Sequence, residues 1–95
     1  MAKKTLLEVT SQLFARYSKI LLDDWHKNKK DPYAHVNQAS MEHLYWMCVT
    51  AQERDMPIDK ASRWLGFVQW CLVMRGLLDV DEERDYTRPL FKDTV

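Results

Sequence analysis

Apolar residues recur at three- and four-residue steps over three stretches of the chain, which is the spacing of one face of an α-helix. The first stretch covers residues 5–27, and Thr5 followed by Glu8 has the spacing of a capping box at its start. Pro32 lies just beyond its end. The pattern therefore predicts a long amphipathic helix, whose inner positions are Leu6, Val9, Leu13, Phe14, Tyr17, Ile20, Leu21 and Trp25.

The second stretch covers residues 38–53 and follows a polar connector over residues 28–38. Asn37 and Ser40 are both candidate N-caps, since a short polar side chain can accept from a free N–H of the first turn. A second helix is predicted here, with an inner face of Leu44, Met47, Cys48 and Ala51.

The third stretch covers residues 58–76, with Pro57 suited to its first turn and Gly76 to its C-terminal cap. Its apolar residues form two stripes. One consists of Ala61, Trp64, Leu65, Val68, Cys71 and Leu72, and the other of Phe67, Trp70, Val73, Met74 and Leu77. A helix that is apolar on both faces, as residues 61–78 are, is either central to a bundle or half buried against a partner.

The acidic segment 79–85 predicts the start of a short fourth helix, with Asp79 as its cap. Residues 88–91 are expected to be extended, because the residue before Pro89 disfavours the helical region. The predicted fold is all-α: a small three-helix bundle with a short fourth helix or an extended C-terminal tail, in one domain over residues 1–95.

The amino-acid composition disfavours an all-β fold and a nucleic-acid-binding domain. Two glycines and three prolines supply too few tight turns for an all-β fold. Fourteen basic and fourteen acidic residues give a net charge of zero, whereas a nucleic-acid-binding domain usually has a basic excess. The four Trp, four Tyr and three Phe indicate a compact core or an interface.

Several features favour a cytoplasmic protein. Cys48 and Cys71 fall within helical patterns and are expected to be buried, reduced thiols. The N-terminal residues lead into a segment that carries Glu8 and Arg16, so they lack the apolar core of a signal peptide. The apolar run 64–78 contains Gln69 and Arg75 and is too short to span a bilayer.

Catalytic and metal signatures are not found in the sequence. His26, His35 and His43 have no metal-ligand spacing, no serine lies in a Gly-x-Ser-x-Gly setting, and there is no glycine-rich phosphate loop. We therefore expect no enzyme activity, no metal and no cofactor. Lys27, Lys29 and Lys30, near Trp25 and Tyr33, could contact single-stranded nucleic acid, but a solvated helix end is the simpler interpretation.

Gly66 is the first unusual residue, because glycine inside a helix costs about 1 kcal/mol relative to alanine. It shares a face with Ser62, Arg63, Gln69 and Trp70. One interpretation is close approach of another helix, within the monomer or across a dimer. The other is the floor of a small-ligand site, with Arg63 and Gln69 as polar contacts and Trp70 as a stacking wall.

The C-terminal segment is the second unusual feature. It combines alternating charges with aromatic residues, which suits a tail that docks by aromatic anchors and ion pairs, either on its own core or on another protein. The candidate interface residues are therefore Arg63, Gly66, Gln69, Trp70 and Met74 of the third helix and Arg84, Tyr86, Arg88 and Phe91 of the tail.

The motif Arg63-Trp64-Leu65-Gly66-Phe67-Val68-Gln69, followed by Arg75-Gly76, by the acidic segment 79–85 and by Thr87-Arg88-Pro89, resembles a pattern in small accessory proteins of tailed bacteriophages and prophages. The resemblance covers about the last third of the chain. Trp70 departs from it, because the pattern has a second glycine there. The resemblance implies a phage accessory or early protein acting in a bacterial cytosol, and it supplies no catalytic residues.

The sequence thus predicts a non-enzymatic protein–protein interaction protein. It would self-associate, as a dimer, through the third helix and modulate or inhibit a process of a bacterial host through contact with a host protein. A small-molecule (nucleotide) binder is one alternative, and a weak nucleic-acid binder is another.

Overall fold

The computed structural model describes residues 4–53 and 55–94, and these residues form four α-helices and one short 3₁₀ turn, with no strand among them. The all-α prediction is therefore confirmed for this part of the chain. Residues 1–3, which belong to the N-terminal segment weighed as a signal peptide, lie outside the described residues.

Helix α1 spans Leu6–Asn28 and begins with the predicted capping box. The backbone N–H of Glu8 donates to the Thr5 hydroxyl, and the N–H of Thr5 donates to the Glu8 carboxylate, both at 3.1 Å. The bond from the Thr5 N–H is the main reason that the pKa of the Glu8 carboxyl is lowered. The helix ends at Lys29, which adopts a left-handed backbone conformation with φ 54°.

Helix α2 spans Met41–Glu53 and follows the 3₁₀ turn η1 at Asn37–Ala39. Ser40 is the cap that the structure uses, since its hydroxyl accepts a 3.2 Å bond from the N–H of His43. The predicted start at residue 38 was three residues early, because residues 37–39 are wound as a tighter turn.

Helix α3 spans Ile58–Met74 and is shorter than predicted at its C-terminal end. Pro57 is the N-cap rather than a residue of the first turn. Gly76, with φ 75°, follows the last turn, and the N–H groups of Gly76 and Leu77 donate to the carbonyls of Val73 and Leu72. This is the hydrogen-bond pattern of a Schellman motif, and it needs a residue that tolerates a positive φ.

Helix α4 spans Val80–Lys92, so the expectation of an extended chain over residues 88–91 was wrong. Asp79 caps the helix as predicted, accepting a 3.0 Å bond from the N–H of Glu82. Pro89 lies inside the last turns, where it removes one backbone donor. With 13 residues, α4 is as long as α2.

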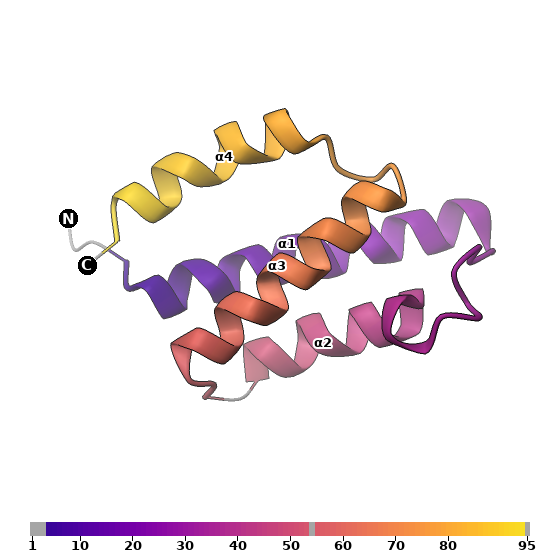
Figure 1. Ribbon diagram of the computed structural model, residues 1–95, viewed down its shortest axis with the longest axis horizontal. Coiled ribbons are helices and arrows are strands. Elements are labelled where there is room, and N and C mark those ends of the chain that lie inside the picture. Colours follow the sequence, from indigo (N-terminus) through magenta and orange to yellow (C-terminus); the bar gives the residue numbers. More distant parts are fainter. Residues whose placement is uncertain (1–3, 54, 95) are drawn as a thin grey trace.

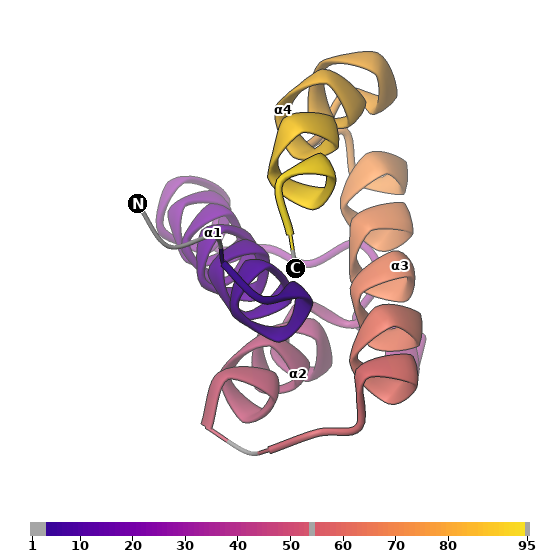
Figure 2. The same cartoon turned by 90° about the vertical axis from the view of Figure 1, so that its left-hand side faces the viewer.

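The helices are arranged around α1, which lies behind α3 in the view of Figure 1, with α2 below and α4 above. The two described ends of the chain lie near one another at the same end of the molecule (Figure 1). Figure 2 shows α3 on the outside, with α1, α2 and α4 all to one side of it. A central position for α3, one of the two arrangements considered from its apolarity, is therefore wrong.

One hydrophobic core joins α1, α2 and α3, and its members are Val9, Leu13, Phe14, Tyr17, Leu21, Leu44, Met47, Cys48, Leu65, Val68, Cys71 and Leu72. Helix α4 adds Leu90 and Phe91, which are half-buried against that core. Among the residues described, no helix is both long and apolar enough to cross a membrane.

Candidate functional site

A groove of about 320 Å³ runs between α3 and α4. Its lining consists of Gly66, Gln69, Trp70, Val73, Leu78, Val80, Glu83, Arg84 and Thr87, and we call it the α3–α4 groove. The structure therefore brings four of the predicted site residues together: Gly66, Gln69 and Trp70 from α3, and Arg84 from α4. Arg63 does not line the groove.

Gly66 is exposed, and a Cβ atom placed on it would meet no atom within 4 Å. The interpretation that Gly66 admits a second helix of the same monomer is therefore wrong. Its backbone φ is not in the left-handed region either, since Gly76 is the glycine with a positive φ. Nothing in the described monomer thus requires glycine at position 66.

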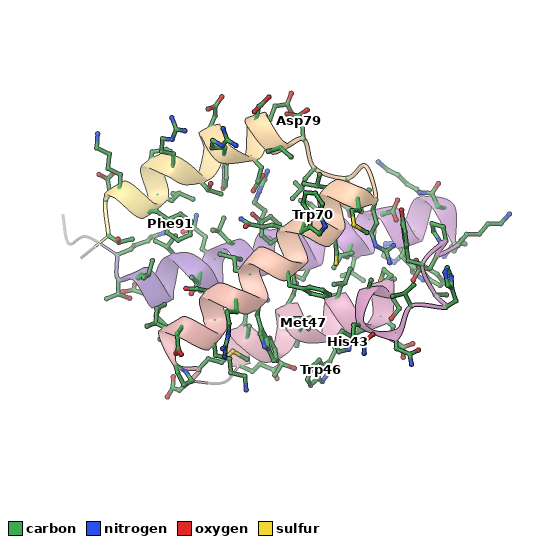
Figure 3. The ribbon with its side chains drawn as sticks, in the orientation of Figure 1. His43, Trp46, Met47, Trp70, Asp79 and Phe91 are labelled. Atoms are coloured by element: carbon green, nitrogen blue, oxygen red, sulfur yellow. The ribbon has the colours of Figure 1, made fainter. Side chains whose placement is uncertain are left out.

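The outer surface of α3 carries large apolar side chains that water reaches. Phe67 is 38% exposed, Trp70 60% and Met74 46%. Together with Arg63 and Gly66 they form what we call the outer face of α3, and Figure 3 shows Trp70 on this side of the helix. Burying such aromatic side chains in an interface typically yields much of its binding energy.

Two residues that line the groove, Gln69 and Glu83, belong to a hydrogen-bonded chain of side chains. The amide of Gln69 donates to the Tyr17 hydroxyl at 2.9 Å, and that hydroxyl donates to Glu83 Oε2 at 2.7 Å. Arg16 donates to both carboxylate oxygens of Glu83. Burial raises the pKa of Tyr17, and the bond to Glu83 raises that of Arg16. The side chain of Gln69 is therefore already hydrogen-bonded within the monomer.

The remaining candidates on α4 lie away from the groove. The Arg16 guanidinium lies 4.1 Å from the centroid of the Tyr86 ring, which is a cation–π contact. Phe91 lies on the side of α4 that faces α1 (Figure 3), and Arg88 is exposed. Tyr86 thus contacts α1 through Arg16, and Phe91 packs against the core.

The ion pair between Arg75 and Asp31 was not predicted from the sequence. Arg75 Nη2 lies 2.8 Å from Asp31 Oδ1, and the two side chains are 4% and 10% exposed. Arg75 also donates to the carbonyl of Ala39, and Asp31 accepts from the N–H groups of Met41 and Tyr33. The available signal was an arginine inside the apolar run 64–78, on the same side of the helix as Val68.

The basic cluster of the connector lies on a different part of the surface. Lys27 and Lys30 line an open cavity of about 880 Å³, together with Asp24, Asn28, Asp31, Pro32 and Arg75. Two carboxylates thus lie beside the three cations of this cavity, so the surface is of mixed charge. Phosphate binding depends mainly on uncompensated basic residues.

Aromatic side chains also gather on the outer side of α2. The centroids of the His43 and Trp46 rings lie 5.5 Å apart, and those of Trp46 and Trp64 lie 5.8 Å apart. Trp46 is 51% exposed. Figure 3 shows His43 and Trp46 at the edge of the molecule, well away from Trp70.

Both cysteines are buried and unpaired, as expected, and burial raises the pKa of the Cys48 thiol to about 12. Within residues 4–53 and 55–94, no three metal-ligating side chains are grouped around a common point. No family model matches the chain, and no curated protein or solved structure matches it either.

Proposed function

We propose that this protein is a non-enzymatic interaction protein that associates with a second copy of itself through the outer face of α3. The observation that carries the proposal is the exposure of Phe67, Trp70 and Met74 in one continuous strip of a helix. Large aromatic residues at the centre of an apolar strip are the typical anchors of protein–protein interfaces.

The overall charge supports self-association. The chain carries 14 basic and 14 acidic residues, so two copies meet without net repulsion. The core is formed by α1, α2 and α3, and we propose that α4 acts as an added arm that borders the interface without completing the core. The interface then uses one surface of α3 while the opposite surface packs in the monomer.

We further propose a bacterial cytoplasm as the place of action and a host protein as the eventual target. This part rests on the resemblance of the C-terminal third to phage accessory proteins. The dimer would then present two copies of the α2 and α4 surfaces, and the host protein would bind there.

Trp70→Glu tests the role of the outer face of α3. The substitution places a charge where an apolar contact is required, so it should convert the dimer to a monomer in size-exclusion chromatography. Helical circular dichroism should not change, because Trp70 is more than half exposed. Trp25→Glu, at an exposed tryptophan at the far end of α1, is the matched control and should leave the dimer intact. A dimer that Trp70→Glu leaves unchanged would contradict the proposal.

A nucleotide-sized ligand is the second candidate occupant of this surface. A groove volume of about 320 Å³ lies at the lower end of the range for small-molecule sites, and Trp70 and Arg84 line it. A nucleotide at a hundred times its dissociation constant would stabilise the fold by about 2.7 kcal/mol. The absence of any thermal shift across a nucleotide panel would exclude this function.

Nucleic-acid binding at Lys27, Lys29 and Lys30 is the third candidate, and the two carboxylates near them weigh against it. If it occurs, binding to single-stranded DNA must weaken steeply as salt is added, because bound lysines release counterions. Binding that is independent of salt would rule out a phosphate contact by these lysines.

A further inference from the structure

The outer face of α3 carries both a projection and a recess. Trp70 projects from the helix, being 60% exposed. One turn earlier, Gly66 has no side chain and open space above it, and the α3–α4 groove lies beside it. A large side chain and the gap that would receive it thus lie four residues apart on one face.

We propose that two copies pair α3 against α3 in antiparallel fashion, with Trp70 of each copy seated over Gly66 of the other. This inference rests on the self-association proposed above and names its geometry. A two-fold axis places the same surface of each copy against the other. Each Trp70 therefore lies over the Gly66 of the other copy, and the contact forms twice. The occupant of the α3–α4 groove is then the indole of the second copy.

The spacing along α3 fits such a pairing. Arg63, Phe67, Trp70 and Met74 follow one another at steps of four, three and four residues, the spacing of a helix–helix seam, and Gly66 lies one turn before Trp70. A helix of 17 residues is about 26 Å long, so the seam covers most of α3.

The charges favour the antiparallel direction. The first turns of α3 carry Lys60 and Arg63 against one acid, Asp59. The opposite end of α3 leads into the start of α4, where Asp79, Asp81 and Glu82 outnumber Arg84. Antiparallel pairing brings the basic end of one copy to the acidic end of the other. Parallel pairing would place the basic ends side by side and leave the two Gly66 recesses empty.

Gly66→Gln should have opposite effects on the monomer and on the dimer. It should stabilise the fold of the monomer and weaken dimerisation. At concentrations where the chain is monomeric, glutamine should raise the thermal midpoint by about 4 °C, since glycine is a poor helix former and the space is open. At high concentration the same side chain should fill the recess and weaken dimerisation at least tenfold. Ala15→Gln, on the exposed side of α1, is the control and should not change dimerisation.

A charge exchange tests the direction of pairing. Arg63→Glu should weaken the dimer several-fold, and adding Asp81→Lys to the same chain should restore it. Both experiments use sedimentation equilibrium on the full chain. A wild-type dimer whose affinity Gly66→Gln leaves unchanged would overturn the Trp70–Gly66 seating while self-association stands. Failure of Asp81→Lys to restore the dimer would overturn the antiparallel direction, and a wild-type chain that is monomeric throughout would overturn self-association itself.

Discussion

Arg75 and Asp31 form an ion pair that is almost entirely removed from water. Asp31 also binds the backbone N–H groups of Tyr33 and Met41, so one carboxylate ties the connector to the start of α2. Arg75 completes the link from the end of α3, and its Nε is buried with no partner among the described residues. Removing two charged side chains from water costs free energy. Replacing only one of them destabilises the fold strongly, because the other charge then stays buried without its partner.

Arg75→Met should therefore lower the free energy of unfolding by about 3 kcal/mol, because Asp31 would keep a buried charge without its cation. Arg63→Met, at an exposed position of the same helix, should change it by no more than about 0.5 kcal/mol. Urea unfolding at low protein concentration measures both. Equal effects of the two substitutions would show that the ion pair does not hold the connector.

The Asp31 carboxyl should also make the free energy of unfolding depend on pH in the acid range. Burial alone would raise its pKa, but the N–H groups of Met41 and Tyr33 and the charge of Arg75 outweigh burial and lower it below the ordinary value of 3.8. A group with a lowered folded-state pKa stabilises the fold above its unfolded-state pKa, and that contribution is lost as the pH falls through the folded value. Wild type should thus lose more stability below pH 3.8 than Asp31→Asn does, relative to neutral pH. Asp23→Asn, an exposed carboxyl on α1, serves as the control, and identical acid profiles for all three would contradict the assignment.

At the scale of elements, α4 differs from the other helices. Its buried residues are Glu83 and Thr87, and its apolar packing comes from Leu90 and Phe91 at the far end. Helix α1, by contrast, buries six residues along its length. Helix α4 is held mainly by the contacts of Arg16 and Tyr17 with Glu83 and by one apolar end.

Native-state hydrogen exchange should reveal this difference. Backbone amides of α4 should exchange through local opening, well before those of α1, because few apolar contacts are lost when α4 detaches. Glu83→Gln should accelerate exchange in α4 while leaving α1 unchanged. Exchange of α4 and α1 at one common rate would mean that the four helices unfold as one unit.

Periodicity and capping chemistry account for most of what the sequence predicted. The Thr5–Glu8 box, the Asp79 cap and the Gly76 terminus are local features, and all three are found in the structure. The error at Pro89 came from a local rule, that the residue before a proline avoids the helical region, whereas in the structure the helix continues and Leu90 and Phe91 pack against the core. Contacts between distant residues, such as Arg16 with Glu83, have no local signal.

The sequence predicted some residues of the candidate site and not others, as it did for the fold. Helical spacing placed Gly66, Gln69 and Trp70 on one face, and all three line the α3–α4 groove. The addition of Arg84 to the same groove depends on how α4 crosses α3, and spacing within one helix contains no information on that. The binding role of these residues stays a prediction.

At the scale of the whole molecule, the main feature is an imbalance between the two sides of α3. One side packs Leu65, Val68 and Leu72 into the shared core, and the other exposes Phe67, Trp70 and Met74 to water. Figure 2 shows no described helix covering that second side. A dimer paired through α3, as proposed, would bury these side chains.

The molar mass of the unmodified chain in solution tests this account most directly. Light scattering coupled to size-exclusion chromatography, over a hundredfold range of concentration, should give twice the 11.4 kDa of one chain at the upper end and a decline toward 11.4 kDa on dilution. A mass of 11.4 kDa at every concentration would contradict self-association through α3.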